Sequence, residues 1–183
     1  MIFEVILDLL TVYLVFPSLI LSQSHTNFVI KRFEVCNHTQ RAIKLYANIT
    51  EKNGIQYIDS TIISPYPWDD NLGALALIDS APTGKRYINL FQIREKNICK
   101  AASMYLSEFW YEIVRRSGLQ PGVCPIPAGR LHCDHAALHF NRMALQTFPF
   151  GDLRFTINTV DNRNPKNILM CFLMEVENFS QKP

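Results

Sequence analysis

The sequence predicts a mainly β protein: an antiparallel β-sandwich or β-cup with immunoglobulin-like layering and one helix between its strands. Short segments of alternating polarity indicate half-buried strands, and turn signals such as Asn53-Gly54 separate them. One stretch, 98–116, has helical spacing of its apolar residues instead. The chain has 183 residues, of which 48% are hydrophobic and 19% charged. This is enough for one core, and it excludes a disordered or collagen-like polypeptide.

The first 24 residues differ in character from the rest. Residues 9–21 read LLTVYLVFPSLIL without a charge, a run shorter than the roughly 20 residues of a membrane span and typical of a signal peptide. Ser22 and Ser24 are small residues in the positions that signal peptidase requires. We therefore expect a signal peptide over 1–24 and one domain over 25–183. Glu4 and Asp8 stand where a signal peptide carries positive charge, which leaves an N-terminal membrane anchor as the alternative.

Two further features agree with an extracellular protein. Asn37, Asn48 and Asn178 each begin an Asn-x-Ser/Thr tripeptide, the acceptor for N-glycosylation. The five cysteines are spread widely, as the disulfide cysteines of secreted domains are. They are Cys36, Cys99, Cys124, Cys133 and Cys171. An odd number leaves one thiol free or paired with another chain, and any four allow three connectivities.

The first predicted strands form a hairpin. Residues 42–50 alternate between an apolar face and a polar face that includes Asn48, so a glycan would be tolerated there. The Asn53-Gly54 turn then leads into a second strand over 55–63. A loop with the aromatic residues Tyr66 and Trp68 follows. A second pair of strands, at 75–78 and 87–93, surrounds the turn Pro82-Thr83-Gly84.

The stretch 98–116 is predicted to be one continuous helix. Its apolar residues recur on one face. They are Ala102, Leu106, Phe109 and Ile113. Asn97 can cap the N-terminus, and Gly118 can adopt the left-handed conformation that ends a helix.

Two strands complete the predicted sheet. Residues 153–158 alternate in polarity, a turn is expected at 162–165, and 168–176 is apolar on both faces until Glu175. A strand that is apolar on both faces belongs at the centre of a sheet.

Catalytic motifs are absent: the sequence has no G-x-S-x-G, H-E-x-x-H, P-loop or C-x-x-C. A net charge of +2 without a basic tract argues against nucleic acid as a partner. The one cluster of metal-ligand types is 132–135 (His-Cys-Asp-His), with His139 and Cys124 nearby. On a regular strand, Cys133 and His135 would share one face, and His132 and Asp134 the other. We interpret the cluster as polar residues near a strand end, and expect no metal and no cofactor.

Three segments carry a family resemblance. The chain reads CPIPAGRL from Cys124 and FPFGDLRFTI over 148–157, and Cys171 lies in the last predicted strand. This order resembles the lipid-recognition (ML) family that includes the ganglioside activator protein, and most of all the insect secreted proteins of the chemosensory B type. The resemblance covers about Cys99 to Glu177. Family members often have an aromatic residue near Gly129, where this chain has Arg-Leu-His-Cys.

The resemblance implies a non-enzymatic β-cup that binds a lipid or another hydrophobic small molecule, with a role in chemosensory or pheromone perception. A membrane surface or a receptor would be a further partner. It also implies the disulfides Cys36–Cys171 and Cys99–Cys124, which leave Cys133 as the free thiol. The residues expected to line the hydrophobic site are Trp68, Tyr105, Leu106, Phe109, Ile113, Phe148 and Phe150.

Two other functions are compatible with the sequence. The aromatic residues could fill a solid core, in which case the protein would act through its surface as a receptor ligand or accessory factor. An apolar cavity and a filled core have the same sequence signature. A secreted metal-dependent enzyme is a third class, and it depends on the histidine cluster alone.

Overall fold

The computed structural model describes residues 27–36 and 41–179, so the expected signal peptide and Asn37 lie outside the described residues. Within that part, antiparallel strands form two sheets, in the orders β1-β8-β7-β4-β5 and β2-β3-β6. The protein is thus a mainly β, antiparallel sandwich, as the sequence predicts. The strands are β1 Phe28–Val35, β2 Lys44–Lys52, β3 Ile55–Ser64, β4 Leu72–Ala81, β5 Ile88–Glu95, β6 Gly129–Ala137, β7 Gly151–Asp161 and β8 Asn164–Asn178.

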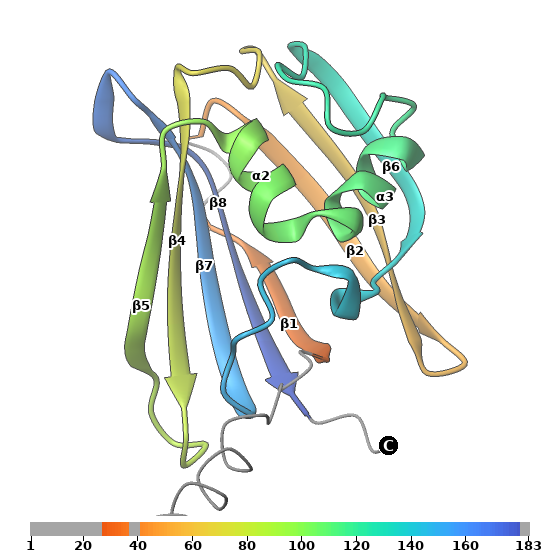
Figure 1. Ribbon diagram of the computed structural model, residues 1–183, viewed down its shortest axis with the longest axis vertical. Coiled ribbons are helices and arrows are strands. Elements are labelled where there is room, and N and C mark those ends of the chain that lie inside the picture. Colours follow the sequence, from red (N-terminus) through yellow and green to blue (C-terminus); the bar gives the residue numbers. More distant parts are fainter. Residues whose placement is uncertain (1–26, 37–40, 180–183) are drawn as a thin grey trace, which may run out of the picture.

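The helices lie on the side of the sandwich between β5 and β6. Figure 1 shows α2 (Ile98–Leu106) and α3 (Glu108–Arg116) across this side, with the segment 138–150 beneath them in the view. That segment contains a short 3₁₀ turn, η3 (Phe140–Arg142). Among the described residues, no helix is long and apolar enough to cross a membrane.

The strands that local pattern predicts are present. β2 and β3 form the expected hairpin, with Asn48 on its exposed face, and β4 pairs with β5 around the expected turn. β8 lies between β1 and β7, in the interior of its sheet, as its apolar residues on both faces predict. β1 is not among the strands that alternation predicts. A bulge between Ile30 and Arg32 interrupts its period.

The single predicted helix is wrong: the chain forms two helices that meet at Ser107. This residue has φ 46° and ends α2 before α3 begins. The expected caps are present, since the Asn97 side chain accepts a hydrogen bond from the Lys100 N–H at 2.9 Å and Gly118 has φ 74°. The four predicted face residues are only partly buried, and the buried helical residues are others. These are Ile98, Cys99, Ala101 and Val114.

Two disulfides connect parts of the sandwich. Cys36, just after β1, bonds to Cys171 in the neighbouring strand β8, and Cys99 at the start of α2 bonds to Cys124 after α3. These are the two pairs that the family resemblance implies. Cys133 is free and buried.

Candidate functional site

A cluster of phenylalanine rings forms one part of the buried core. Phe28 of β1 lies at its centre, with ring centroids 5.5 Å from Phe140, 5.4 Å from Phe148 and 5.4 Å from Phe155. Phe109 of α3 stacks on Phe140 at 5.0 Å. Strands β1 and β7 of the five-stranded sheet, helix α3 and the 138–150 segment therefore converge on this group of rings, which we call the phenylalanine cluster.

The phenylalanine cluster continues to the surface at strand β5. Phe91 stacks on Phe148 with a centroid separation of 6.2 Å, yet 37% of Phe91 is exposed. Phe91 pairs with the buried Ile78, and Ile88 pairs with the buried Ser80. Paired residues point to the same face of a sheet, so Phe91 and Ile88 point to the inner face. Ile88 is nevertheless 51% exposed. The sandwich is open along this edge.

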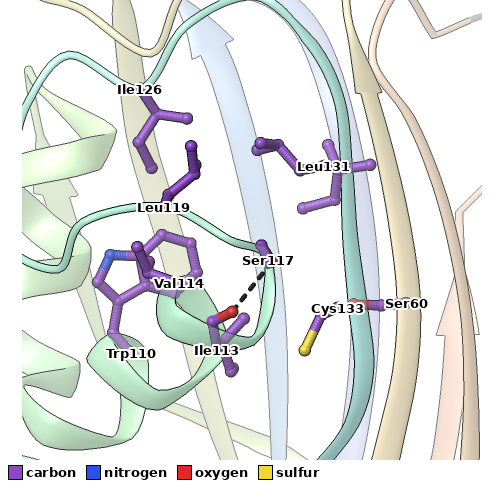
Figure 2. Close-up of a pocket in the computed structure, with 10 residues that line it drawn as sticks. Ser60, Trp110, Ile113, Val114, Ser117, Leu119, Ile126, Leu131 and Cys133 are labelled. Carbon is purple, nitrogen blue, oxygen red and sulfur yellow. Dashed lines mark hydrogen bonds between the residues drawn. The ribbon is translucent and has the colours of Figure 1, made fainter.

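A small cavity lies in another part of the interior, between α3 and the three-stranded sheet. Figure 2 shows Trp110 and Ile113 of the helix opposite Leu131 and Cys133 of β6. The volume is about 20 Å³, which is room for about one water molecule. Burial raises the pKa of the Cys133 thiol, which disfavours its reactive thiolate form. The cavity as it stands is an apolar gap.

Helix α3 packs on the interior through apolar side chains. Its ion pairs stay within the helix, where Glu112 binds Arg115 at 3.2 Å and Arg116 at 3.0 Å. These two partners hold the pKa of Glu112 below its usual value. Apolar contacts are not directional, and the ion pairs that the structure describes for α3 join residues of the same helix.

The residues expected to line one site are distributed over several environments. Trp68 lies in a second cluster of buried residues, separate from the phenylalanine cluster, and its ring stacks on Trp110 at a centroid distance of 6.0 Å. Phe109 and Phe148 belong to the phenylalanine cluster, and Ile113 lines the small cavity.

The remaining expected residues are peripheral. Tyr105 donates a hydrogen bond from its hydroxyl to Glu95 at 2.8 Å, which raises the pKa of Tyr105. Leu106 is half-buried at the end of α2, and Phe150 is 48% exposed.

Four further residues complete the phenylalanine cluster and are not indicated by the sequence pattern: Phe28, Phe91, Phe140 and Phe155. Three of them lie on strands, and only their pairing brings them together. The one available signal is the placement of Phe91 and Phe155 in predicted strands.

The histidine cluster does not form a metal site in the described part of the chain, where no group of three or more potential ligands converges. Cys133 and His135 do not share a face of β6, contrary to the expectation. A bulge at His135, which has φ 45°, reverses the alternation of side chains along the strand. The His135 N–H donates to Asp59 at 2.8 Å, and the His135 ring stacks on Tyr57 at 4.3 Å.

Asn178, which the sequence predicts as a glycosylation acceptor, has a buried and fully hydrogen-bonded side chain in this fold. Its side chain is 1% exposed, and its amide nitrogen, the atom that a glycan would occupy, donates to the carbonyls of Phe148 and Pro149 at 3.2 and 3.0 Å. Its amide oxygen accepts from the Asn27 N–H at 3.0 Å. The side chain therefore fastens the 138–150 segment to β8.

We expect Asn178→Ala to lower the free energy of unfolding by about 2–3 kcal/mol, because it leaves one buried and two partly buried backbone groups without their partners. Urea unfolding of protein made without glycans measures this loss. The exposed Asn48→Ala serves as control and should change stability by less than about 0.5 kcal/mol. A glycan found on Asn178 in the folded protein would contradict the role assigned here.

Comparisons with known proteins find similarity in structure but none in sequence. No family model matches it, and no curated protein is similar to it in sequence. Among solved structures, chicken MD-1 complexed with lipid IVa is similar at 15% identity and a TM-score of 0.40, over 85% of this chain and 96% of that one.

Proposed function

We propose that this is an extracellular, non-enzymatic protein that binds a lipid or another hydrophobic small molecule. The observation that carries the proposal is the open edge at β5, where the inward-facing Ile88 and Phe91 are exposed beside the phenylalanine cluster. Such residues are buried in a completed sandwich, and a contiguous exposed apolar surface is a frequent mark of a binding site.

The composition of the interior supports an apolar guest. Its buried polar side chains are all uncharged in the described residues: Ser64, Ser80, Asn158, Thr159 and Asn178. A charged group would remain unpaired there and would cost several kcal/mol. A hydrocarbon chain instead gains about 0.8 kcal/mol for each buried methylene. A lipid headgroup would therefore stay outside, at the open edge.

Entry of a guest requires the interior to rearrange, since aromatic rings fill it. Helix α3 is suited to this movement because its ion pairs are internal to the helix. Its displacement would join the small cavity under Ile113 to the phenylalanine cluster through Phe109, which packs on Phe140. The resemblance to insect chemosensory proteins further leads us to propose a hydrophobic cue, such as a pheromone, as the guest, with a membrane surface or receptor as its source or destination.

A second function is favoured by one observation. The cavity of about 20 Å³ under α3 and the pocket of about 190 Å³ beside Phe28 and Phe140 are both below the roughly 300–1,000 Å³ of small-molecule sites. A solid core of this kind fits a secreted interaction protein that acts through its surface as a receptor ligand or accessory factor.

Displacement of a fluorescent fatty probe distinguishes the two functions. We expect Ile88→Asp to weaken probe binding at least tenfold, the effect of losing about 1.4 kcal/mol of apolar contact. Ile63→Asp is the matched control, because Ile63 is 41% exposed but lies on the outer face of the other sheet, next to the inward-facing Ile62. It should change binding less than about twofold and stability as little as Ile88→Asp does.

Wild-type protein that binds no apolar probe, and that yields no lipid on organic extraction and mass spectrometry, would support the solid-core interaction protein instead. Equal effects of Ile88→Asp and Ile63→Asp would remove β5 as the point of entry.

A further inference from the structure

A pocket lies beside β1, which is the edge of the five-stranded sheet opposite to β5 (Figure 1). Its volume is about 190 Å³, the space that about six water molecules occupy in the liquid. The start of β1, the β2–β3 turn and the segment 138–141 form its walls. None of the described residues that line it is Lys, Arg, Asp or Glu, and its polar side chains are Asn27, Gln56, His139 and Asn141.

The Gln56 side chain pairs with the edge of β1 next to this pocket. Its amide nitrogen donates a hydrogen bond to the Ile30 carbonyl at 2.9 Å, and its amide oxygen accepts one from the Ile30 N–H at 2.8 Å. One carboxamide thus satisfies both backbone groups of one strand residue, as a neighbouring strand would.

Phe28 directs the same two backbone groups toward the same side. In an antiparallel pair, successive residues point their N–H and C=O alternately toward the partner strand and away from it. Asn27 bonds toward β8, because its carbonyl accepts from the Phe179 N–H at 3.2 Å and its N–H donates to the Asn178 side chain at 3.0 Å. The Phe28 N–H and C=O therefore point away from β8, as those of Ile30 do.

These two groups of Phe28 have little access to water outside the pocket. Phe28 lines the pocket and is only 5% exposed as a whole. Within the described part of the chain, no residue across this edge is hydrogen-bonded to its N–H or C=O. A backbone donor and acceptor that are buried without partners are costly, so a molecule that supplies both partners gains affinity here.

We propose that this pocket binds a small neutral molecule through a carboxamide group, whose N–H and C=O pair with the C=O and N–H of Phe28. A carboxamide has the adjacent donor and acceptor that Gln56 already uses at Ile30. A carboxylate would supply no donor, and the described lining offers it no lysine or arginine. Because Gln56 occupies the next position along the edge, there is room for one amide group and not for a peptide strand.

Apolar side chains beside Phe28 define the rest of the ligand. Ile55 and Phe179 line the pocket and are each 39% exposed, so they offer contact to a short alkyl chain. The volume is below that of sites for drug-sized molecules, which limits the ligand to a short-chain amide. This site lies at the opposite sheet edge from Ile88 and Phe91, and it does not depend on hydrophobic binding at β5.

Titration of the secreted full chain with hexanamide tests the proposal. The protein carries isotope-labelled phenylalanine, and the loss of one amide signal in Phe28→Leu assigns the Phe28 N–H in the NMR spectrum. We expect hexanamide to shift this signal. It should bind at least about fivefold more tightly than methyl hexanoate or hexanoate, neither of which has an N–H, as the loss of one hydrogen bond predicts.

Two neighbouring variants separate binding in the pocket from contact elsewhere. Asn141 lines the pocket and is exposed, so Asn141→Trp should fill part of this small volume and weaken hexanamide binding at least about tenfold. Arg142 is exposed on the same 3₁₀ turn but is not among the lining residues. Arg142→Trp should therefore change binding less than about twofold. Thermal unfolding checks that both variants are folded.

Absence of hexanamide binding, an unmoved Phe28 signal, or equal affinities for the three hexanoyl compounds would overturn the proposal. Unchanged hexanamide binding by folded Asn141→Trp would do so as well. Ile88→Asp should leave hexanamide binding within about twofold, so failure of the amide site and failure of hydrophobic binding at β5 are seen in different measurements.

Discussion

Replacing Cys36 and Cys171 together by alanine is expected to lower the free energy of unfolding by about 5 kcal/mol. This disulfide closes a sequence separation of 135 residues, and the entropy that a cross-link removes from the unfolded chain grows with the length of the loop. Domains of this size are stable by only about 5–15 kcal/mol. The variant should therefore unfold at a much lower urea concentration than the wild type, or fail to fold at 37 °C.

The second disulfide provides the comparison. Cys99–Cys124 closes a separation of only 25 residues, so the corresponding double alanine variant should lose about 3 kcal/mol. Urea unfolding of both variants, with the slope of the transition recorded, tests the order of the two effects. A larger loss for the shorter loop would show that strain or residual structure in the unfolded state, rather than loop entropy, controls these bonds.

Phe28→Ala is expected to cost about 3–5 kcal/mol, the usual range for removing a buried phenylalanine ring. Phe28 is buried and contacts three other rings of the phenylalanine cluster, so its loss leaves a cavity that neighbours on several different segments cannot fill together. Phe28→Leu keeps most of the volume and should cost less than about 1.5 kcal/mol. Thermal and urea unfolding of delipidated protein measure both.

Two variants of the phenylalanine cluster, Phe109→Ala and Phe148→Ala, distinguish a core from a binding site. Phe109 is half-buried at the margin and contacts Phe140, whereas Phe148 is fully buried. If a guest enters beneath α3, Phe109→Ala should weaken binding of a fatty probe more than it lowers stability, and Phe148→Ala should do the reverse. Parallel losses of stability, with no probe binding by the wild type, would identify a solid core.

The parts of this fold that follow from sequence are those fixed by neighbouring residues. The β2–β3 hairpin depends on its Asn-Gly turn and on alternation, and the ends of the helical region depend on Asn97 and Gly118. Each of these signals acts over a few residues, and each element forms where it is predicted.

The errors arise where distant contacts override the local pattern. Nothing in the apolar spacing of 98–116 indicates a break, yet Ser107 adopts φ 46° there, between a helix bonded to β5 through Tyr105 and one packed on β6. The bulge at His135 likewise depends on Asp59, 76 residues away. The spacing of apolar residues along the sequence does not show which distant residues will make these contacts.

The sequence predicts that the candidate site is apolar, but it does not predict which residues form it. Aromatic enrichment indicates an apolar interior, and Phe109 and Phe148 do belong to it. Its central residue, Phe28, precedes every strand that alternation predicts, and it meets Phe140 and Phe155 only because β1 pairs with β8 beside β7. Which rings meet is a property of strand order, and strand order is not readable from local pattern.

The bulges in β1, β5 and β6 have a consequence for how copies of this protein behave toward one another. The sandwich does not close into a barrel, so these strands present unpaired backbone groups at the edges of their sheets. Each of the three pairings that they make contains a register shift, and β1 also carries the charged residues Lys31, Arg32 and Glu34. An irregular or charged edge is a poor template for a strand from another molecule. The fourth edge strand, β2, pairs without a register shift, so this protection against edge-to-edge joining applies to three of the four edges.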